Sequence, residues 1–384
     1  MNRFQILVVE GIGKNVRIAV ALFALIWFET APVFAAAPSP GAAKAKQAAE
    51  ANGFIFELSH DEIVAKARKE GRLRALIGWD TPNHSHLIAA FKKKYPFIDI
   101  HLEEIPGSDA GQRFILELKA DRVRNWDVLH INTDHYGEFP PYLTKFDILG
   151  MAEQKVLAIP KGMIDPKHRN LVALGNIVDV VGFNRNLMAR EKVPGRLEDF
   201  LKPEFKGRKF LTDIRPLAYA ALVPELGLDW LTDYAKQLAA QEPVWVRGFT
   251  RAYTAIMAGE YPLHSLGNYN AIIRMARKDP TASLDYKLIE PVPVRIHEPQ
   301  GVYRAAAHRY AALLWLEFQA GPEGQRIIDQ YEPLKSSIHA PGSELEKLIR
   351  GKRVSLKGWD NWQEYTKWVG VLTDAFGFPK AQLK

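Results

Sequence analysis

Residues 73–105 read LRALIGWDTPNHSHLIAAFKKKYPFIDIHLEEI and change their hydrophobic periodicity twice. Residues 73–77 are a short apolar strand, whereas residues 85–95 carry apolar side chains at helical spacing. Residues 98–105 then alternate between apolar and polar side chains as a second strand. Strands and helices that alternate at this pace predict an α/β fold, with a mainly parallel sheet flanked by helices.

The same pattern continues on both sides of this stretch. A helix is expected at 60–70, where Gly71 ends it, and the alternation extends through a helix at 110–123 to a strand at 127–131. Later segments repeat the theme, with strands at 155–160 and 177–183 and helices at 228–240, 250–259, 269–278, 306–319 and 361–376.

The N-terminus has the pattern of a secretion signal. Arg3, Lys14 and Arg17 precede an apolar run at 18–28, and small residues follow. The run is shorter than the roughly 20 apolar residues that span a bilayer. We therefore predict a signal peptide at residues 1–35 and a periplasmic mature protein, with cleavage after Ala35 or, alternatively, Ala37. An uncleaved anchor or a buried helix is the competing interpretation.

The rest of the chain is long enough for two domains. Cleavage would leave 349 of the 384 residues, more than one hydrophobic core usually covers. The chain has no cysteine, so an exported form must rely on its core rather than on disulfides. Residues 36–57, rich in Ala, Pro, Lys and Gln near their start, are expected to be a flexible leader.

The charge of the chain slightly favours anionic ligands. The formal net charge is +7, and the signal peptide holds three basic and two acidic residues, so the mature chain keeps +6. The basic residues are scattered among acids and form no stripe interleaved with aromatics, so we expect no nucleic-acid partner.

Several short segments occur in an order that is typical of one protein family: 69–73, 91–100, 126–128, 193–207, 258–262 and 321–325. On these segments the chain, from about Lys69 to Tyr331, resembles bacterial extracellular solute-binding proteins of ABC transporters. The resemblance is to the group that includes ferric-ion, polyamine and thiamine binders. Each segment alone is common in proteins, and the shared order over some 260 residues carries the resemblance.

The resemblance implies a two-lobed periplasmic-binding-protein fold, in which each lobe is a mainly parallel sheet flanked by helices. Lobe 1 would comprise residues 58–181 and 292–340, and lobe 2 residues 182–291. Crossing strands near 180–184 and 289–294 would form the hinge, and residues 341–384 a C-terminal helical extension. A ligand bound between the lobes stabilises the closed form, which a membrane permease can recognise. We expect a monomer without a cofactor.

Candidate ligand contacts follow from the rule that ligands bind beyond the carboxyl ends of the strands. Trp79 and Thr81 follow the first strand, and Asn132 and Thr133 follow the strand at 127–131. Trp79 offers a stacking face, and the polar side chains offer hydrogen bonds. The alternative is that the polar residues cap helices and that Trp79 lies in the core.

In the second lobe, Arg215 follows a predicted strand and can bind a carboxylate or phosphate through two hydrogen bonds. A salt bridge to Asp213 is the alternative. Asn268 and Tyr269 lie in another loop at this edge. Tyr269-Asn270 stands where ferric-ion binders have two adjacent tyrosines, and this departure disfavours direct iron coordination. An organic anion is therefore the favoured ligand.

Two other functions remain open. A secreted metal-dependent hydrolase would use Asp80, His84 and His86, although histidines two residues apart at a helix start point away from each other. Common catalytic motifs are missing from the sequence, so we do not expect an enzyme. A ligand sensor for a membrane receptor is the other alternative.

Overall fold

The computed structural model describes residues 40–105, 107–131 and 133–377. The predicted signal peptide and its cleavage site lie outside these residues. The described strands are β1 (Arg72–Ile77), β2 (Asp99–Glu104), β3 (Val128–His130), β4 (Leu171–Asn184), β5 (Leu211–Asp213), β6 (Val244–Val246), β7 (Leu263–Asn268), β8 (Leu284–Lys287), β9 (Val292–Val302) and β10 (Val354–Lys357).

The α-helices vary widely in length and stand between the strands for most of the chain. They are α1 (Pro40–Ala51), α2 (His60–Glu70), α3 (His84–Lys94), α4 (Gly107–Lys119), α5 (Ile148–Glu153), α6 (Leu217–Ala220), α7 (Val223–Leu226), α8 (Leu228–Ala240), α9 (Phe249–Met257), α10 (Tyr269–Ala276), α11 (Arg309–Ala320), α12 (Pro322–Tyr331), α13 (Glu344–Ile349) and α14 (Trp362–Phe376). This order confirms the predicted α/β class.

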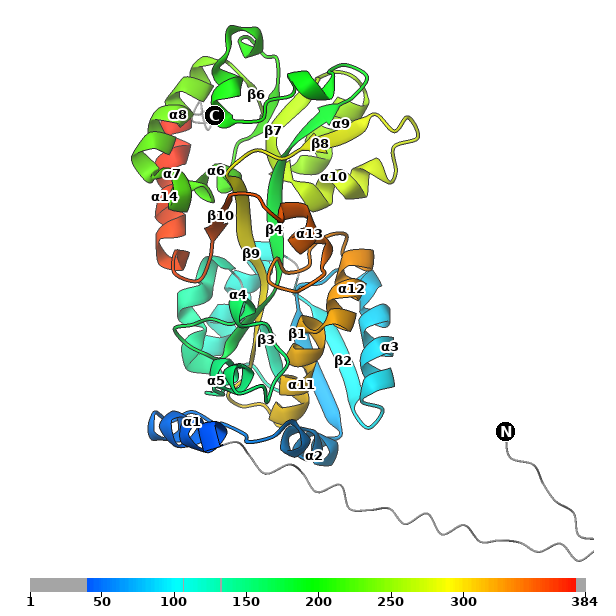
Figure 1. The fold of residues 1–384 in the computed structure, drawn as a ribbon, viewed down its shortest axis with the longest axis vertical. Helices are drawn as coiled ribbons and strands as arrows, with labels where there is room; N and C mark the ends of the chain where they lie inside the picture. Colours follow the sequence, from blue (N-terminus) through cyan, green and yellow to red (C-terminus); the bar gives the residue numbers. More distant parts are fainter. Residues whose placement is uncertain (1–39, 106, 132, 378–384) are drawn as a thin grey trace, which may run out of the picture. The chain divides into compact units, whose positions relative to one another are not determined.

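The strands are hydrogen-bonded in the order β2-β1-β3-β9-β4-β7-β5-β6. Figure 1 shows β1, β2 and β3 at one end of the long strands β4 and β9, and β6 and β7 at the other. We call the part built on β1, β2 and β3 the first lobe, and the part built on β5, β6 and β7 the second lobe. The pairs β1–β2, β1–β3, β5–β6 and β5–β7 are parallel. Antiparallel pairing among the named strands involves β4 or β9, so each lobe has a parallel centre bordered by these two long strands.

Strands β4 and β9 extend from one lobe into the other. The first part of β4 pairs with β9, from Leu171 opposite Gly301 to Val178 opposite Val294. From Asp179 onward β4 pairs with β7 and β8 instead. On its other side, β9 pairs in parallel with β10, beginning at Val292. The crossing therefore contains β4, β9 and β10 side by side.

Each lobe has its own hydrophobic core. In the first lobe, α11 is buried all round, from Ala311 to Ala320, because its apolar side chains cover every face of the helix. Trp315 at its centre is fully buried and packs edge-on against Phe91 of α3. In the second lobe, buried side chains of α8 such as Leu231 pack in one cluster with those of α14.

Three segments differ from the sequence-based expectations. Residues 40–51, part of the expected flexible leader, form α1, since alanine strongly favours helix and Ala42 and Ala49 are buried. Residues 155–160 form no strand, because Lys155 adopts a left-handed φ of +60° and the Ala158 N–H donates to Glu317 instead of to a neighbouring strand.

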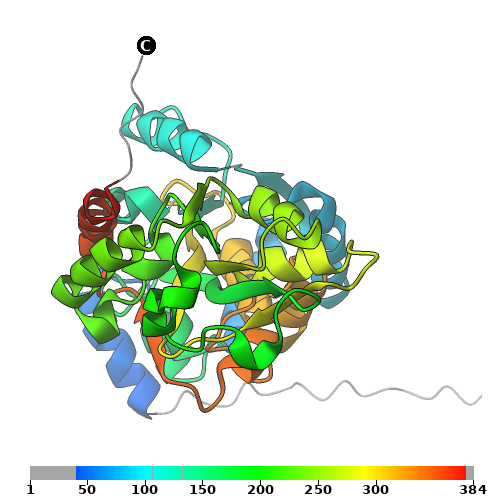
Figure 2. The same cartoon turned by 90° about the horizontal axis from the view of Figure 1, so that it is seen from above.

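The third difference concerns residues 341–384, expected to be a helical extension. Within the described part of this segment, β10 joins the sheet and α14 lies beside α8, as Figures 1 and 2 show. Trp368, Leu372 and Phe376 of α14 are buried in the second-lobe core, because they lie on one apolar face of that helix. The lobe boundaries given above stay a prediction.

Candidate functional site

The carboxyl ends of β1 and β3 lie at one edge of the first lobe, next to the middle of β9. Glu298 of β9 organises this edge. Its Oε1 accepts hydrogen bonds from the Gly78 N–H at 2.8 Å and from Gln300 Nε2 at 2.7 Å, and it lies 3.3 Å from His130 Nδ1. Burial alone would raise the pKa of Glu298, but His130, His297 and the Gly78 N–H lower it to about 2. The side chain is therefore a buried carboxylate that fixes the loop after β1.

The backbone at this edge tolerates few alternatives. Glu298 adopts a left-handed φ of +52°, which is costly for a residue with a side chain. Gly78 faces it, and any side chain at position 78 would collide with Glu298 and His130. The glycine thus allows the close approach through which the carboxylate holds the loop.

The loop after β1 is tied down along its length. Trp79 is fully buried in the first-lobe core, and its Nε1–H donates to Gln319 at 3.0 Å. The Asp80 N–H donates to Glu332 Oε1 at 2.7 Å. Thr81 is exposed and donates to Glu104 Oε2 through its N–H at 2.7 Å and its hydroxyl at 2.5 Å. The stacking face expected of Trp79 is not exposed, since the indole packs between the sheet and α11.

The second predicted loop of this lobe is only partly visible. Asn132 lies outside the described residues. Thr133 begins the short 3-10 helix Thr133–Glu138, and its side chain is not described. Their predicted role in ligand binding stays a prediction.

At the edge of the second lobe, β5, β6 and β7 end together because they run parallel. Arg215 follows β5, and Asp213 accepts its Nε–H at 3.1 Å and its Nη2–H at 3.0 Å. The predicted alternative, a salt bridge to Asp213, is thus present. The Arg215 side chain nevertheless remains 45% exposed, while that of Asp213 is only 5% exposed. The buried carboxylate therefore orients a guanidinium that still reaches the surface.

Tyr269 begins α10 and is nearly buried. Its hydroxyl donates to Tyr286 Oη at 3.4 Å, with the two rings 4.7 Å apart and at a steep angle. Burial raises the pKa of the Tyr269 phenol, and the hydrogen bond to Tyr286 raises it further. The phenol is consequently neutral in the ligand-free protein.

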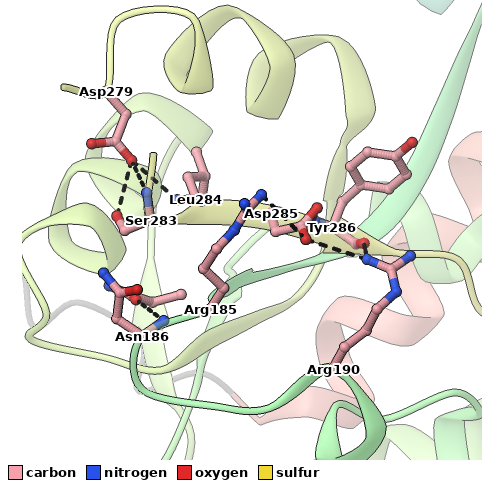
Figure 3. A network of polar contacts seen from close by, with 9 residues as sticks. Arg185, Asn186, Arg190, Asp279, Ser283, Leu284, Asp285 and Tyr286 are labelled. Atoms are coloured by element: carbon pink, nitrogen blue, oxygen red, sulfur yellow. Dashed lines mark hydrogen bonds and ion pairs between the residues drawn. The ribbon is translucent and has the colours of Figure 1, made fainter. Parts of the chain in front are cut away.

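A surface network fixes the position of Tyr286 on β8. Asp285, its neighbour in sequence, pairs with Arg185 at 3.4 Å and with Arg190 at 3.3 Å. Arg190 also donates to the Tyr286 carbonyl at 3.1 Å, as Figure 3 shows. On the incoming loop, Asp279 accepts hydrogen bonds from the backbone of Ser283 and Leu284. These contacts attach β8 to the segment after β4 and so hold the partner of Tyr269.

Asn268, the last residue of β7, contacts the crossing strands. Its Oδ1 accepts a hydrogen bond from Arg295 Nη2 at 3.0 Å. Arg295 of β9 also forms a two-point ion pair with Asp179 of β4, with both N–O distances at 3.1 Å. Asp179 is fully buried. One guanidinium therefore joins both crossing strands to the edge of the second lobe.

Among the ion pairs of the described residues, one links the loop after β1 to the second lobe. Asp80 Oδ2 lies 3.3 Å from Arg274 Nη2 of α10, and both side chains are about two-fifths exposed. Arg274, Arg295 and Glu298 were not predicted from the sequence, because each contacts a partner more than 100 residues away. The position of Arg274 one turn into a helix that follows a predicted cleft loop was the only signal available.

The histidines of the hydrolase alternative do not converge. His84 Nε2 hydrogen-bonds the Trp79 carbonyl at 2.8 Å, whereas the His86 ring stacks on Tyr331 at 3.5 Å. Within the described ranges, no group of three His, Cys, Asp or Glu residues is placed to hold a metal ion. In the same ranges, none of the helices combines the length and the apolar character needed to cross a bilayer.

Solved structures share this fold at low sequence identity. A ferric binding protein from Bordetella has a TM-score of 0.63 at 14% identity, covering 79% of this chain and 98% of its own. Apo ferric ion-binding protein A from Pasteurella haemolytica has a TM-score of 0.62 at 14% identity, covering 81% and 100%. The substrate-binding protein of an ABC transporter from Agrobacterium tumefaciens has a TM-score of 0.59 at 16% identity, covering 79% and 94%. These similarities confirm the two-lobed periplasmic-binding-protein fold.

Sequence comparison identifies the family directly. A comparison with curated proteins gives no match. The family model for bacterial extracellular solute-binding proteins, in contrast, matches residues 140–365, which is more than half of the chain and includes Arg215, Asn268 and Tyr269. The chain therefore belongs to the family of bacterial extracellular solute-binding proteins.

Proposed function

We propose that this chain is the periplasmic substrate-binding component of an ABC importer, and that it binds an organic anion between its two lobes. The family match supports the solute-binding role, and one of the structural neighbours is named as part of an ABC transporter. The observation that carries the choice of ligand is the exposed guanidinium of Arg215, held in place at the edge where ligands bind in open α/β sheets.

Arg215 retains hydrogen-bonding capacity beyond its ion pair. A guanidinium has five N–H donors, and Asp213 accepts from Nε and Nη2. The edge formed by Nη1 and the second Nη2 hydrogen remains for a ligand, and this edge fits a carboxylate through two parallel hydrogen bonds. Asp213 already restricts the rotation of the Arg215 side chain, so less conformational entropy is lost when a ligand binds.

The neighbouring loop adds positive charge. Val246, the last residue of β6, lies opposite Asp213 of β5, so Arg247 lies on the loop next to Arg215. Arg247 is exposed and has no ion-pair partner within the described residues. Asp213 neutralises the charge of Arg215, and the charge of Arg247 remains. This edge therefore has a net positive charge, which favours an anion.

A free ferric ion fits this edge less well, although several neighbours are named as ferric-ion binders. Tyr269-Asn270 stands where the family resemblance implies two adjacent tyrosines, so one of the two phenolate ligands is replaced by an amide. Thr81 and Asn268 are proposed as hydrogen-bonding contacts, and Tyr269 as an aromatic contact. Trp79 is instead assigned to holding the loop, because its ring is buried. The working form is proposed to be a monomer that docks on a membrane permease.

Titration calorimetry of the mature protein with a panel of carboxylates, including citrate and ferric citrate, tests the ligand. A hydrogen bond to a charged group contributes roughly 1.5–3 kcal/mol, so Arg215→Ala should weaken the best hit by about one to two decades. Lys209→Ala is the matched control, because it removes one exposed positive charge just before β5, at the opposite end of the same strand. Equal binding by Arg215→Ala and wild type would refute the assignment, as would tight binding of free ferric ion with a tyrosinate absorption band.

The importer role is tested separately from the ligand. Deleting the gene should abolish uptake of the radiolabelled ligand, and the wild-type gene should restore it. A sensor for a membrane receptor would instead leave uptake intact while changing gene expression.

A further inference from the structure

The first lobe contains a cavity at the edge of the sheet opposite the loops described above. It has a volume of about 430 Å³ and lies between the start of β1, the segment before β3 and the segment after β9. Strand β1 spans Arg72–Ile77, and a strand rises about 3.3 Å per residue, so the two residues of β1 that line this cavity, Arg72 and Arg74, lie about 17 and about 10 Å before the end of the strand. The cavity is therefore separate from the proposed ligand site.

The cavity is lined by positive charge. Arg72, Arg74 and Arg124 line it together with His308, and Asp127 is the one acid among its described lining residues. Arg72 and Arg74 are two residues apart on a strand, so their side chains leave the same face of the sheet. The Cα atoms from which these two arginine side chains extend are therefore about 6.6 Å apart along the strand.

The charge of Asp127 is already used inside the fold. Asp127 is 2% exposed, and its carboxylate accepts hydrogen bonds from the backbone N–H groups of Arg74 at 2.8 Å and His308 at 2.9 Å. It also lies 3.0 Å from His308 Nδ1. Arg124 pairs at 3.2 Å with Asp121, which does not line the cavity. Neither Arg72 nor Arg74 has an ion-pair partner in the part of the chain that the structure describes.

Arg74 is held in one orientation without being satisfied. Its guanidinium carbon lies 4.8 Å from the centre of the Trp126 ring, and Trp126 in turn stacks on His101. The Nε–H of Arg74 is buried and has no hydrogen-bond partner among the described residues. A buried donor without an acceptor is rare in folded proteins, so Arg74 is incompletely satisfied by the chain itself.

We propose that this cavity is a second binding site and that it takes a phosphate group, either free phosphate or the phosphate of a small phosphoester. Arginines recognise such oxyanions through several hydrogen bonds at once, and a dianion matches the two unpaired guanidinium groups better than a monocarboxylate does. The bound phosphate contacts β1 and the segments next to β3 and β9, and so stabilises the first lobe by an amount that grows with the logarithm of its concentration above the dissociation constant.

Calorimetry of the mature protein in a phosphate-free buffer tests this site, with inorganic phosphate and glycerol 3-phosphate as probes and citrate for comparison. We expect saturable binding of one phosphate, weakened at least tenfold by Arg72→Ala and by Arg74→Gln. Arg122→Ala is the matched control, because it removes an exposed arginine from the same loop without touching the cavity. Tighter binding of glycerol 3-phosphate than of inorganic phosphate would identify a phosphoester as the better ligand, and tighter binding of inorganic phosphate would identify free phosphate.

The outcomes separate this site from the proposed ligand site. Arg215→Ala should leave phosphate binding unchanged. If that variant loses phosphate while Arg72→Ala retains it, phosphate binds at the second-lobe edge and the inference is wrong. Absence of saturable binding at millimolar phosphate, or equal affinity for citrate, would also overturn it. If thermal unfolding shows that Arg74→Gln is not folded, Arg72→Ala decides the question. Arg72 is exposed and has no ion-pair partner among the described residues, so its replacement should leave the fold intact.

Discussion

The ion pair between Asp179 and Arg295 offers the most direct test of the crossing strands. Asp179 is fully buried, the Arg295 side chain is 12% exposed, and both N–O distances are 3.1 Å. Arg295→Met keeps most of the side-chain volume but leaves the carboxylate buried without its counter-charge. Breaking a buried pair in this way costs about 3–5 kcal/mol of the free energy of unfolding.

The cost should depend on pH with a defined sign. Burial raises the pKa of Asp179, and Arg295 lowers it. Without Arg295 the pKa in the folded state rises further, so the folded variant binds more protons than the unfolded chain at a pH above about 4. Its stability therefore falls as pH increases, and the deficit relative to wild type should grow from pH 4.5 to pH 7.

Urea unfolding followed by tryptophan fluorescence, at both pH values, measures this effect. Arg350→Met is the matched control, because Arg350 forms an exposed ion pair with Glu346 and its loss should change stability far less. Adding Asp179→Leu to Arg295→Met should recover part of the loss, since an apolar pair needs no counter-charge. A deficit at pH 7 no larger than that of Arg350→Met, or one independent of pH, would refute the reasoning.

Trp79→Ala should lower the free energy of unfolding by about 3–5 kcal/mol, because it empties a fully buried site, and a calorimetric melting temperature equal to that of wild type would contradict this. Glu298, with a pKa of about 2 in the fold against an ordinary 4.5, should contribute about 3 kcal/mol that is lost as pH falls from 4.5 to 2. Glu298→Gln should flatten the acid limb of the stability profile measured by urea unfolding. Ligand at a hundredfold excess over its dissociation constant should add about 2.7 kcal/mol to the free energy of unfolding. It should also reduce the radius of gyration in small-angle scattering. Saturation without such compaction would contradict closure of the lobes.

Local patterns predicted the helices and the order of strands well. The helix at 60–70 matches α2, because Ser59 caps its start and Gly71 ends it with a left-handed φ of +66°. The helix at 228–240 matches α8 for a similar reason, since its apolar residues recur with the helical period. Such signals lie within a dozen residues of the structure that they determine.

The candidate site depended on contacts that no local pattern encodes. Arg215 was placed at the correct strand end, and its partner Asp213 was named because the two are close in sequence. Glu298 and Gly78 are 220 residues apart, so their hydrogen bond left no signal in the sequence. Trp79 followed the first strand as expected, but the choice between a stacking face and a core position depended on α11, which supplies Gln319 from the other end of the chain.

The arrangement of β4, β9 and β10 restricts how the lobes can move relative to each other. Three adjacent strands joined by ladder hydrogen bonds resist sliding and in-plane rotation, because either motion would break those bonds. Bending across the strands leaves the hydrogen bonds intact. Opening and closing should therefore follow one angular coordinate, so that a single distance between spin labels, one on each lobe, would suffice to describe the conformational state of the protein.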